Sequence, residues 1–161
     1  MATACMAEIV QVQTEEQLQA VRVMFQEYHS ELPPQIRTVC FAQEVESLPG
    51  KYAPPHGALL LATIAGQSAG CVGLRPFPGL EGACEMKRLY VRPEFRGEKL
   101  GVLLMQQIIS EARSRGYRRL RLDTHPPSMQ SAVALYRRFN FAVVTDVTDP
   151  VPELMYMELK L

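Results

Sequence analysis

Residues Tyr90–Gly101 read YVRPEFRGEKLG and join a strand-like segment, 84–91, to a helix-like segment, 101–115. A loop that leads from a strand into a helix N-terminus is a potential anion site. The first-turn N–H groups are unpaired there, and the helix dipole adds partial positive charge. Gly97 and Gly101 allow a bulky phosphate group to approach the backbone closely. The stretch therefore predicts a site for a phosphate-bearing ligand.

The side chains of Arg96 and Lys99 add positive charge at the same loop. The stretch contains neither the GxxxxGK[ST] pattern of a Walker A loop nor the GxGxxG pattern of a dinucleotide site. An ATP-binding phosphotransferase is therefore disfavoured. A plain helix-capping loop with solvated charges remains open as an alternative on these local features.

Outward from the loop, hydrophobic periodicity predicts further strands and helices in both directions. Thr14 and Gln17 fit a capping box, and Asn140 fits a left-handed helix cap. Early hairpins and late crossovers imply a mixed sheet with helices on both faces, in a single domain over 1–161. The expected order is βααβββαβαββ. The strands fall at 8–13, 58–64, 69–75, 84–91, 118–124, 141–145 and 154–160, and the helices at 14–29, 39–48, 101–115 and 129–139.

Composition excludes several classes of protein. The 161 residues are 47% hydrophobic and 21% charged, with 17 basic and 17 acidic side chains. Zero net charge argues against nucleic acid or an anionic membrane as a partner. The longest apolar run, 57–66, is far shorter than the roughly 20 residues of a membrane helix, and no secretory signal is evident, so we expect a cytoplasmic protein.

The four cysteines, Cys5, Cys40, Cys71 and Cys84, show no metal-binding spacing. This predicts reduced thiols and no metal.

The zero net charge conceals an uneven distribution. Residues 1–80 carry 4 basic and 7 acidic side chains, whereas 81–161 carry 13 and 10. Within 87–121 there are 10 basic and 3 acidic side chains, a net of +7. This window contains the proposed phosphate loop, so it favours an anionic ligand there, although solvated helix faces would give the same count.

The sequence resembles the GNAT superfamily of acetyl-CoA-dependent N-acetyltransferases in three segments, which have the order and spacing of that family. Arg96–Gly101 matches its loop motif [RQ]-x-x-G-x-[GA], with Lys99 where the family usually has Gly. Because the loop acts through backbone N–H groups, Lys99 can serve there if its backbone angles are ordinary helical ones. The stretches LYVRPEFRG and ALYRRFNF also resemble the family, the second with Asn140 in place of Gly, and Met129 stands where many members have Asn.

The resemblance implies a mostly antiparallel twisted sheet in which the parallel strands 84–91 and 118–124 splay apart and hold acetyl-CoA. The pantetheine arm would pair with the first of these strands, and the pyrophosphate would rest on the N–H groups of 96–101. The implied cofactor-binding residues are Leu89, Tyr90, Val91, Arg96, Gly97, Glu98, Lys99, Leu100, Gly101, Thr124, Ala132 and Tyr136.

The implied reaction needs a base for the amine, a donor to the oxyanion and an acid for the thiolate. Glu85 is the candidate base, and strand alternation would place it on one face with Lys87, Leu89 and Val91. Its alternative is a solvated or Lys87-paired carboxylate. Tyr136 is the candidate acid, with a core aromatic as the alternative, and the N–H of Leu89 is the candidate oxyanion donor.

The predicted function is acetyl transfer to a primary amine of a small molecule, peptide or protein by direct attack. The alternative is a non-catalytic acyl-CoA-binding sensor or interaction domain on the same scaffold. The segments expected to form the acceptor pocket, 28–38, 75–83 and 146–155, contain no transferable code for the acceptor. His125 could line this pocket or lie on the surface. A homodimer is implied only by the family.

Overall fold

A seven-stranded sheet forms the centre of the computed structural model, which describes residues 6–161. The strand order is β1-β2-β3-β4-β5-β7-β6, and of the neighbouring pairs in it only β4 and β5 run parallel. The predicted mixed, mostly antiparallel sheet is thus confirmed. The strands are β1 Ala7–Gln11, β2 Ala58–Ile64, β3 Gln67–Pro76, β4 Ala83–Val91, β5 Arg119–Thr124, β6 Ala142–Val143 and β7 Met155–Lys160.

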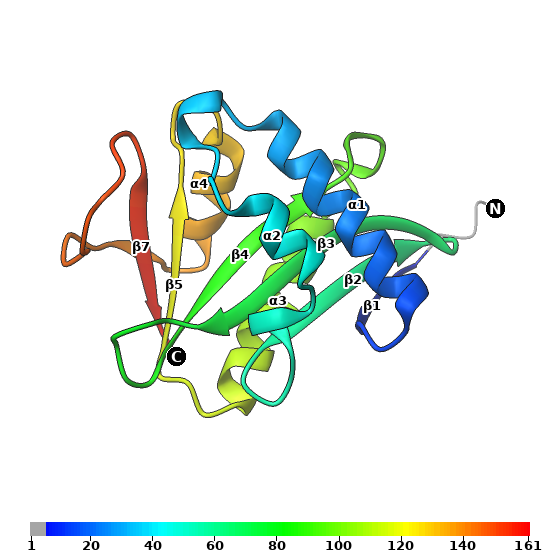
Figure 1. Cartoon of the computed structure of the whole chain (residues 1–161), viewed down its shortest axis with the longest axis horizontal. Helices are drawn as coiled ribbons and strands as arrows, with labels where there is room; N and C mark the ends of the chain where they lie inside the picture. Colours follow the sequence, from blue (N-terminus) through cyan, green and yellow to red (C-terminus); the bar gives the residue numbers. More distant parts are fainter. Residues whose placement is uncertain (1–5) are drawn as a thin grey trace.

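Helices cover both faces of the sheet, as predicted (Figure 1). On one face, α1 (Glu15–Glu31) and α2 (Phe41–Glu46) share a core cluster with Tyr52 and Leu59. On the other face, α3 (Leu100–Ser114) and α4 (Gln130–Arg138) contribute to a larger cluster with strand residues. Short 3-10 turns occupy Pro34–Ile36, Gly50–Tyr52 and Pro93–Phe95.

Local sequence signals explain where several elements begin and end. The Thr14 side chain accepts from the Gln17 N–H at 3.1 Å while the Gln17 side chain accepts from the Thr14 N–H, so the predicted capping box forms at α1. Asn140 follows α4 with a φ of 70°, the left-handed conformation that its short polar side chain tolerates. The element order βααβββαβαββ is confirmed, with boundaries shifted by a few residues at most.

A one-residue bulge in β4 changes which side chains share a face. Cys71 of β3 pairs with Tyr90 whereas Gly73 pairs with Lys87, so β4 holds one more residue than β3 over this interval. Arg88 sits there with a φ of 61°. Glu85 and Lys87 therefore lie on the α1/α2 face, whereas Leu89 and Val91 pack into the α3/α4 cluster. The prediction that these four side chains share one face was wrong, because the bulge breaks the alternation.

Glu44 of α2 holds the bulged residue in place. Arg88 Nε donates to Glu44 Oε2 at 3.0 Å, and the guanidinium lies 5.1 Å from the Phe41 ring centroid. The other Glu44 oxygen accepts from Arg75 at 3.3 Å and from the Tyr52 hydroxyl at 3.2 Å. One carboxylate thus satisfies three donors that would otherwise be poorly solvated.

Replacing Glu44 by Gln should destabilise the fold by about 2 kcal/mol, because two guanidinium groups lose their charged acceptor. The measurement is the free energy of unfolding from urea denaturation. Glu46→Gln is the matched control, since Glu46 lies exposed in the same helix. Equal stability of the two variants would contradict the role assigned to Glu44.

Candidate functional site

A groove opens where the pairing of β4 with β5 ends. The two strands pair only over Ala83–Glu85 and Arg119–Arg121, and beyond these residues they diverge toward their C-terminal ends (Figure 1). The groove has a volume of about 1110 Å³. It is lined by both strands, the end of α1 and the loop after it, the start of α4 and the β6–β7 connection. The splayed parallel pair that the family resemblance implied is present.

Most of the predicted cofactor-binding residues line this groove, namely Leu89, Tyr90, Val91, Arg96, Gly101, Thr124, Ala132 and Tyr136. Gly97, Glu98 and Lys99 lie outside its lining at the exposed edge of the phosphate loop. Leu100 is buried in the α3/α4 cluster, so only its backbone could contact a ligand. Among residues 6–161, Glu85 is the predicted catalytic residue that the groove lining does not include.

The loop before α3 presents a run of free backbone donors. The first helical bond of α3 runs from the Leu103 N–H to the Lys99 carbonyl at 3.2 Å. In the part of the chain that the structure describes, the N–H groups of residues 97–102 donate to no acceptor. Six adjacent free donors at a helix N-terminus fit a diphosphate group, which offers several acceptor oxygens in a row.

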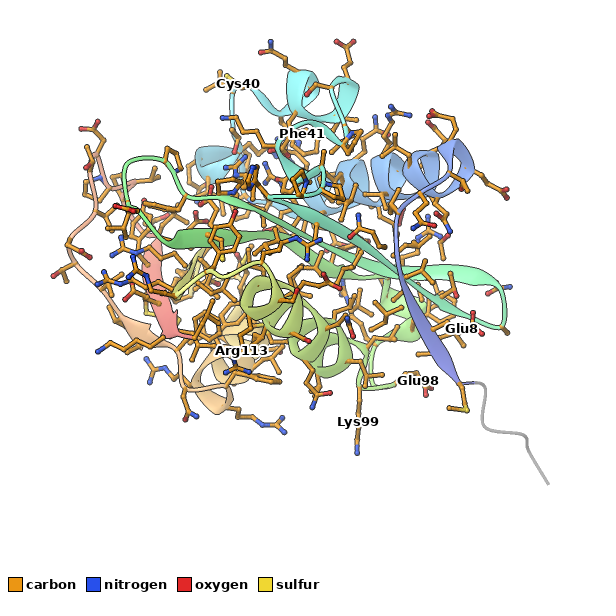
Figure 2. The ribbon with its side chains drawn as sticks, turned by 90° about the horizontal axis from the view of Figure 1, so that it is seen from below. Glu8, Cys40, Phe41, Glu98, Lys99 and Arg113 are labelled. Atoms are coloured by element: carbon orange, nitrogen blue, oxygen red, sulfur yellow. The ribbon has the colours of Figure 1, made fainter. Side chains whose placement is uncertain are left out.

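Lys99 lacks the helical backbone angles on which its fit to the loop motif was conditional. It forms the N-cap of α3 with φ 60° and ψ 22°, a left-handed conformation, so that condition is not met. A left-handed residue at this point suits glycine, because a Cβ atom is disfavoured there. This explains why a Gly is usual at this place in the motif. The Lys99 side chain projects away from the body of the molecule (Figure 2) and does not line the groove.

Ion pairs neutralise much of the positive window at 87–121. Arg92 pairs with Glu27 at 2.8 Å, Arg96 with Glu31 at 3.2 Å and Arg88 with Glu44 at 3.0 Å. These acidic partners belong to α1 and α2. The negative N-terminal half thus compensates the positive C-terminal half within the fold. The inference that the window favours an anionic ligand by its net charge is correspondingly weakened, and the backbone donors become the stronger argument.

Glu85 lies in a cross-strand ion pair. Arg75 Nε donates to Glu85 Oε1 at 2.6 Å, and the carboxylate is buried on the α2 side of the sheet. The partner of Glu85 is thus Arg75. The alternative interpretation had named Lys87 or solvent instead. Lys87 pairs instead with Asp123 of β5 at 3.2 Å.

Tyr136 of α4 is a core aromatic that also faces the groove. Its ring is buried in the α3/α4 cluster with a centroid 5.9 Å from that of Phe141, and it also lines the groove. Burial raises the pKa of its phenol, and the nearby Tyr28 and Asp123 act in the same direction. The hydroxyl therefore keeps its proton at neutral pH.

The structure adds groove residues that the sequence pattern did not single out. The Lys87–Asp123 pair bridges the two strands beyond the end of their pairing, on the α1/α2 face. Tyr28 lies beside it, and burial raises the pKa of this tyrosine to about 12 while Arg88 opposes the shift. Lys87 and Asp123 are 36 residues apart, as are the paired residues Glu85 and Arg121. The ion pair could therefore have been predicted only if the register of β4 and β5 had been known.

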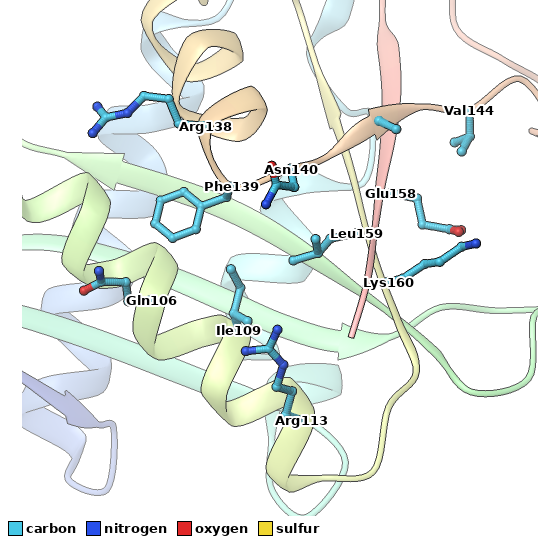
Figure 3. Close-up of a pocket in the computed structure, with 11 residues that line it drawn as sticks. Gln106, Ile109, Arg113, Arg138, Phe139, Asn140, Val144, Glu158, Leu159 and Lys160 are labelled. Atoms are coloured by element: carbon cyan, nitrogen blue, oxygen red, sulfur yellow. The ribbon is translucent and has the colours of Figure 1, made fainter.

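A second hollow lies behind the sheet between α3, the end of α4 and β7 (Figure 3). Its volume is about 880 Å³, and Ile109, Phe139 and Leu159 line it together with Arg113, Arg138 and Lys160. None of the predicted site residues lines it. The groove between β4 and β5 is therefore the candidate active site.

A parallel strand pair that splays beside an uncapped, glycine-containing helix start offers a groove for an extended, phosphate-bearing ligand. Sequence comparison agrees, since the model of the acetyltransferase (GNAT) family matches residues 18–141. The chain belongs to the GNAT family. It is an acetyl-CoA-dependent acyltransferase, in keeping with the names of its relatives.

Two curated relatives and two solved structures illustrate the similarity. An uncharacterized N-acetyltransferase of Schizosaccharomyces pombe is 40% identical over 93% of this chain and 92% of its own length. An IAA acetyltransferase of Azospirillum brasilense is 36% identical over 56% of this chain and 58% of its own. Ribosomal-protein-alanine N-acetyltransferase from Brucella melitensis has a TM-score of 0.74, with 21% identity over 96% of this chain and 99% of that one. A GNAT acetyltransferase from Staphylococcus aureus has a TM-score of 0.76, with 16% identity over 96% and 99%.

Three further findings concern the residues from 6 onward. No helix there is long and apolar enough to cross a membrane. No group of three or more His, Cys, Asp or Glu side chains there could hold a metal ion. Cys40, Cys71 and Cys84 are free thiols, and Cys5 lies outside the described residues.

Lys99→Gly should stabilise the protein by about 1 kcal/mol, because glycine adopts the left-handed N-cap without a Cβ penalty. Thermal or urea unfolding measures the change. Lys99→Ala is the control that removes the charge but keeps the strain, so it should give no such gain. A gain in the alanine variant as large as in the glycine variant would show that charge, not backbone conformation, limits stability here.

Proposed function

We propose that this protein transfers the acetyl group of acetyl-CoA to a primary amine by direct attack in a ternary complex. The observation that carries the proposal is the position of the protonated Tyr136 in the wall of the groove that also reaches the phosphate loop. Arg96 and Gly101 connect the loop to this groove. A phosphate-bearing cosubstrate seated on the loop would thus extend its acyl end toward Tyr136.

The residues present fit acetyl-CoA. The free N–H groups of 97–102 would hold the pyrophosphate, and the main chain of Leu89 and Val91 would pair with the pantetheine amides. Support for this comes from the early end of the β4–β5 pairing, which leaves that edge of β4 without a partner strand beyond Glu85. The bound cosubstrate supplies an activated thioester.

Protein groups would then act on each part of the transfer. The amine nitrogen forms a bond to the acetyl carbon as the carbon–sulfur bond breaks. The Leu89 N–H donates to the developing oxyanion, and Tyr136 gives its proton to the departing sulfur. The raised pKa of Tyr136 keeps this proton available throughout the neutral range. No covalent acetyl-enzyme is needed.

We assign removal of the amine proton to Asp123 in place of Glu85. Asp123 lines the groove and is half-buried, and Lys87 at 3.2 Å holds its carboxylate in position. Glu85, by contrast, is buried in its pair with Arg75, outside the groove lining. A base must lie within hydrogen-bond reach of the proton that it takes, directly or through one water.

The acceptor is a primary amine of a small molecule, a peptide or a protein. Names of relatives and neighbours include an acetyltransferase for IAA and one for alanine of a ribosomal protein. Peptides are therefore included in the test. A panel of amines, amino acids, polyamines and peptides should release free thiol from acetyl-CoA with at least one member. Binding of acetyl-CoA without turnover on any member would instead support the sensor alternative.

Tyr136→Phe should lower kcat about 10²-fold with the best acceptor of the panel, because the phenylalanine ring cannot protonate the thiolate. Acetyl-CoA affinity, measured by calorimetry, should stay unchanged, since the ring still fills its place in the core. As the pH rises, loss of the Tyr136 proton should not lower wild-type activity until beyond pH 10, because burial raises the pKa of this phenol. An unchanged kcat in the variant would remove Tyr136 from the mechanism.

Asp123→Asn should lower kcat more than Glu85→Gln does at neutral pH, by about 10²-fold against less than about 10-fold. The comparison uses kcat at saturating acetyl-CoA, with unfolding curves to account for any loss of stability. If Glu85→Gln proves the more damaging change in a folded protein, the assignment of the base returns to Glu85.

A further inference from the structure

A serine, a histidine and a glutamate form a chain of hydrogen bonds at the C-terminal end of β5. The Ser128 Oγ lies 2.7 Å from His125 Nδ1, and His125 Nε2 lies 3.2 Å from Glu153 Oε2. The imidazole is only 3% exposed, whereas Ser128 is exposed and lines the groove. Direct acetyl transfer as described above uses none of these three side chains.

This arrangement is the one by which proteins activate a serine hydroxyl. The nucleophile must lie within hydrogen-bond reach of a base, and a third group must orient that base. With the ring hydrogen on Nε2, His125 donates to Glu153 and accepts from the Ser128 hydroxyl at Nδ1. The serine thus lies at Nδ1 and the carboxylate at Nε2. An imidazole can act as a base through either of its ring nitrogens, so Nδ1 is the base in this arrangement.

The start of α4 adds donors beside the serine. The N-cap Met129 makes no side-chain capping bond, and the first helical bond at this end runs from the Val133 N–H to the Met129 carbonyl at 3.0 Å. Over residues 6–161, the N–H groups of 130–132 donate to no acceptor. Donors of this kind can stabilise the oxyanion that forms when a serine attacks an acyl group.

We infer that Ser128, His125 and Glu153 form a second catalytic centre, which hydrolyses short-chain acyl esters and thioesters without an amine acceptor. Ser128 and His125 are its catalytic residues, and Glu153 is a positioning residue that acts through the imidazole. The inference goes beyond the proposed function and does not depend on it, since water replaces the amine.

The reaction balances in two steps. Ser128 Oγ bonds to the acyl carbon as the bond to the leaving oxygen or sulfur breaks, and His125 passes the serine proton to that leaving group. Water then attacks the acyl-serine, His125 takes a proton from the water and returns it to Ser128, and the carboxylic acid leaves. The net change is ester plus water to acid plus alcohol or thiol.

The test measures release of p-nitrophenol from p-nitrophenyl acetate by the full-length protein, with no acetyl-CoA and no amine present. Ser128→Ala and His125→Gln should each lower the rate about 10²-fold, and Glu153→Gln should lower it about 10-fold. Ser110→Ala is the matched control, because Ser110 is also an exposed serine but lies outside the groove. The exposed Cys40 thiol is common to all variants, so its background reaction cancels.

Labelling of the wild-type protein with a fluorophosphonate, followed by peptide mapping, keeps the test independent of variant folding. Phosphonylation of Ser128 supports the second centre. Equal p-nitrophenol release by the wild-type, Ser128→Ala and Ser110→Ala proteins would overturn it, and so would absence of label on Ser128. Thiol release from acetyl-CoA that depends on the added amine bears only on the proposed function and leaves this result unaffected.

Discussion

The pairing of β4 with its two neighbours is the constraint on which the rest of the site depends. β4 pairs with β3 along most of its length but with β5 only over Ala83–Glu85. The bulge at Arg88 rotates the end of β4, so that Leu89 and Val91 turn toward α3 and α4 while Lys87 stays on the α1/α2 face. The groove exists because β4 stays paired with β3 along most of its length but separates from β5 after Glu85.

Helices α1 and α2 stabilise this strained strand end through charge. Glu44 holds the bulged Arg88, while Glu27 and Glu31 hold Arg92 and Arg96 just beyond β4. The uneven charge of the two halves of the sequence is thus explained by ion pairs within the fold more than by the charge of a ligand. What remains for a phosphate-bearing cosubstrate is a run of backbone donors, which depends on conformation and not on net charge.

Much of the fold could be predicted from sequence because several elements carry a local signal, as the Thr14 capping box and the left-handed Asn140 show. The site was predicted only in part. The groove residues from Leu89 to Val91 and Tyr136 were implied by the resemblance to the GNAT family. The left-handed Lys99, the Glu85–Arg75 pair and the His125–Ser128–Glu153 chain did not follow, because they depend on backbone angles, strand register and loop packing that no local pattern encodes.

The most direct test of the account is residue-resolved amide hydrogen exchange with and without acetyl-CoA. The backbone donors of 97–102 and the free edge of β4 at Leu89 and Val91 should gain protection on binding, because their N–H groups acquire acceptors. Amides lining the second hollow, around Arg113 and Lys160, should exchange as before. Protection at that hollow, with none at the loop before α3, would contradict the placement of the cosubstrate between β4 and β5.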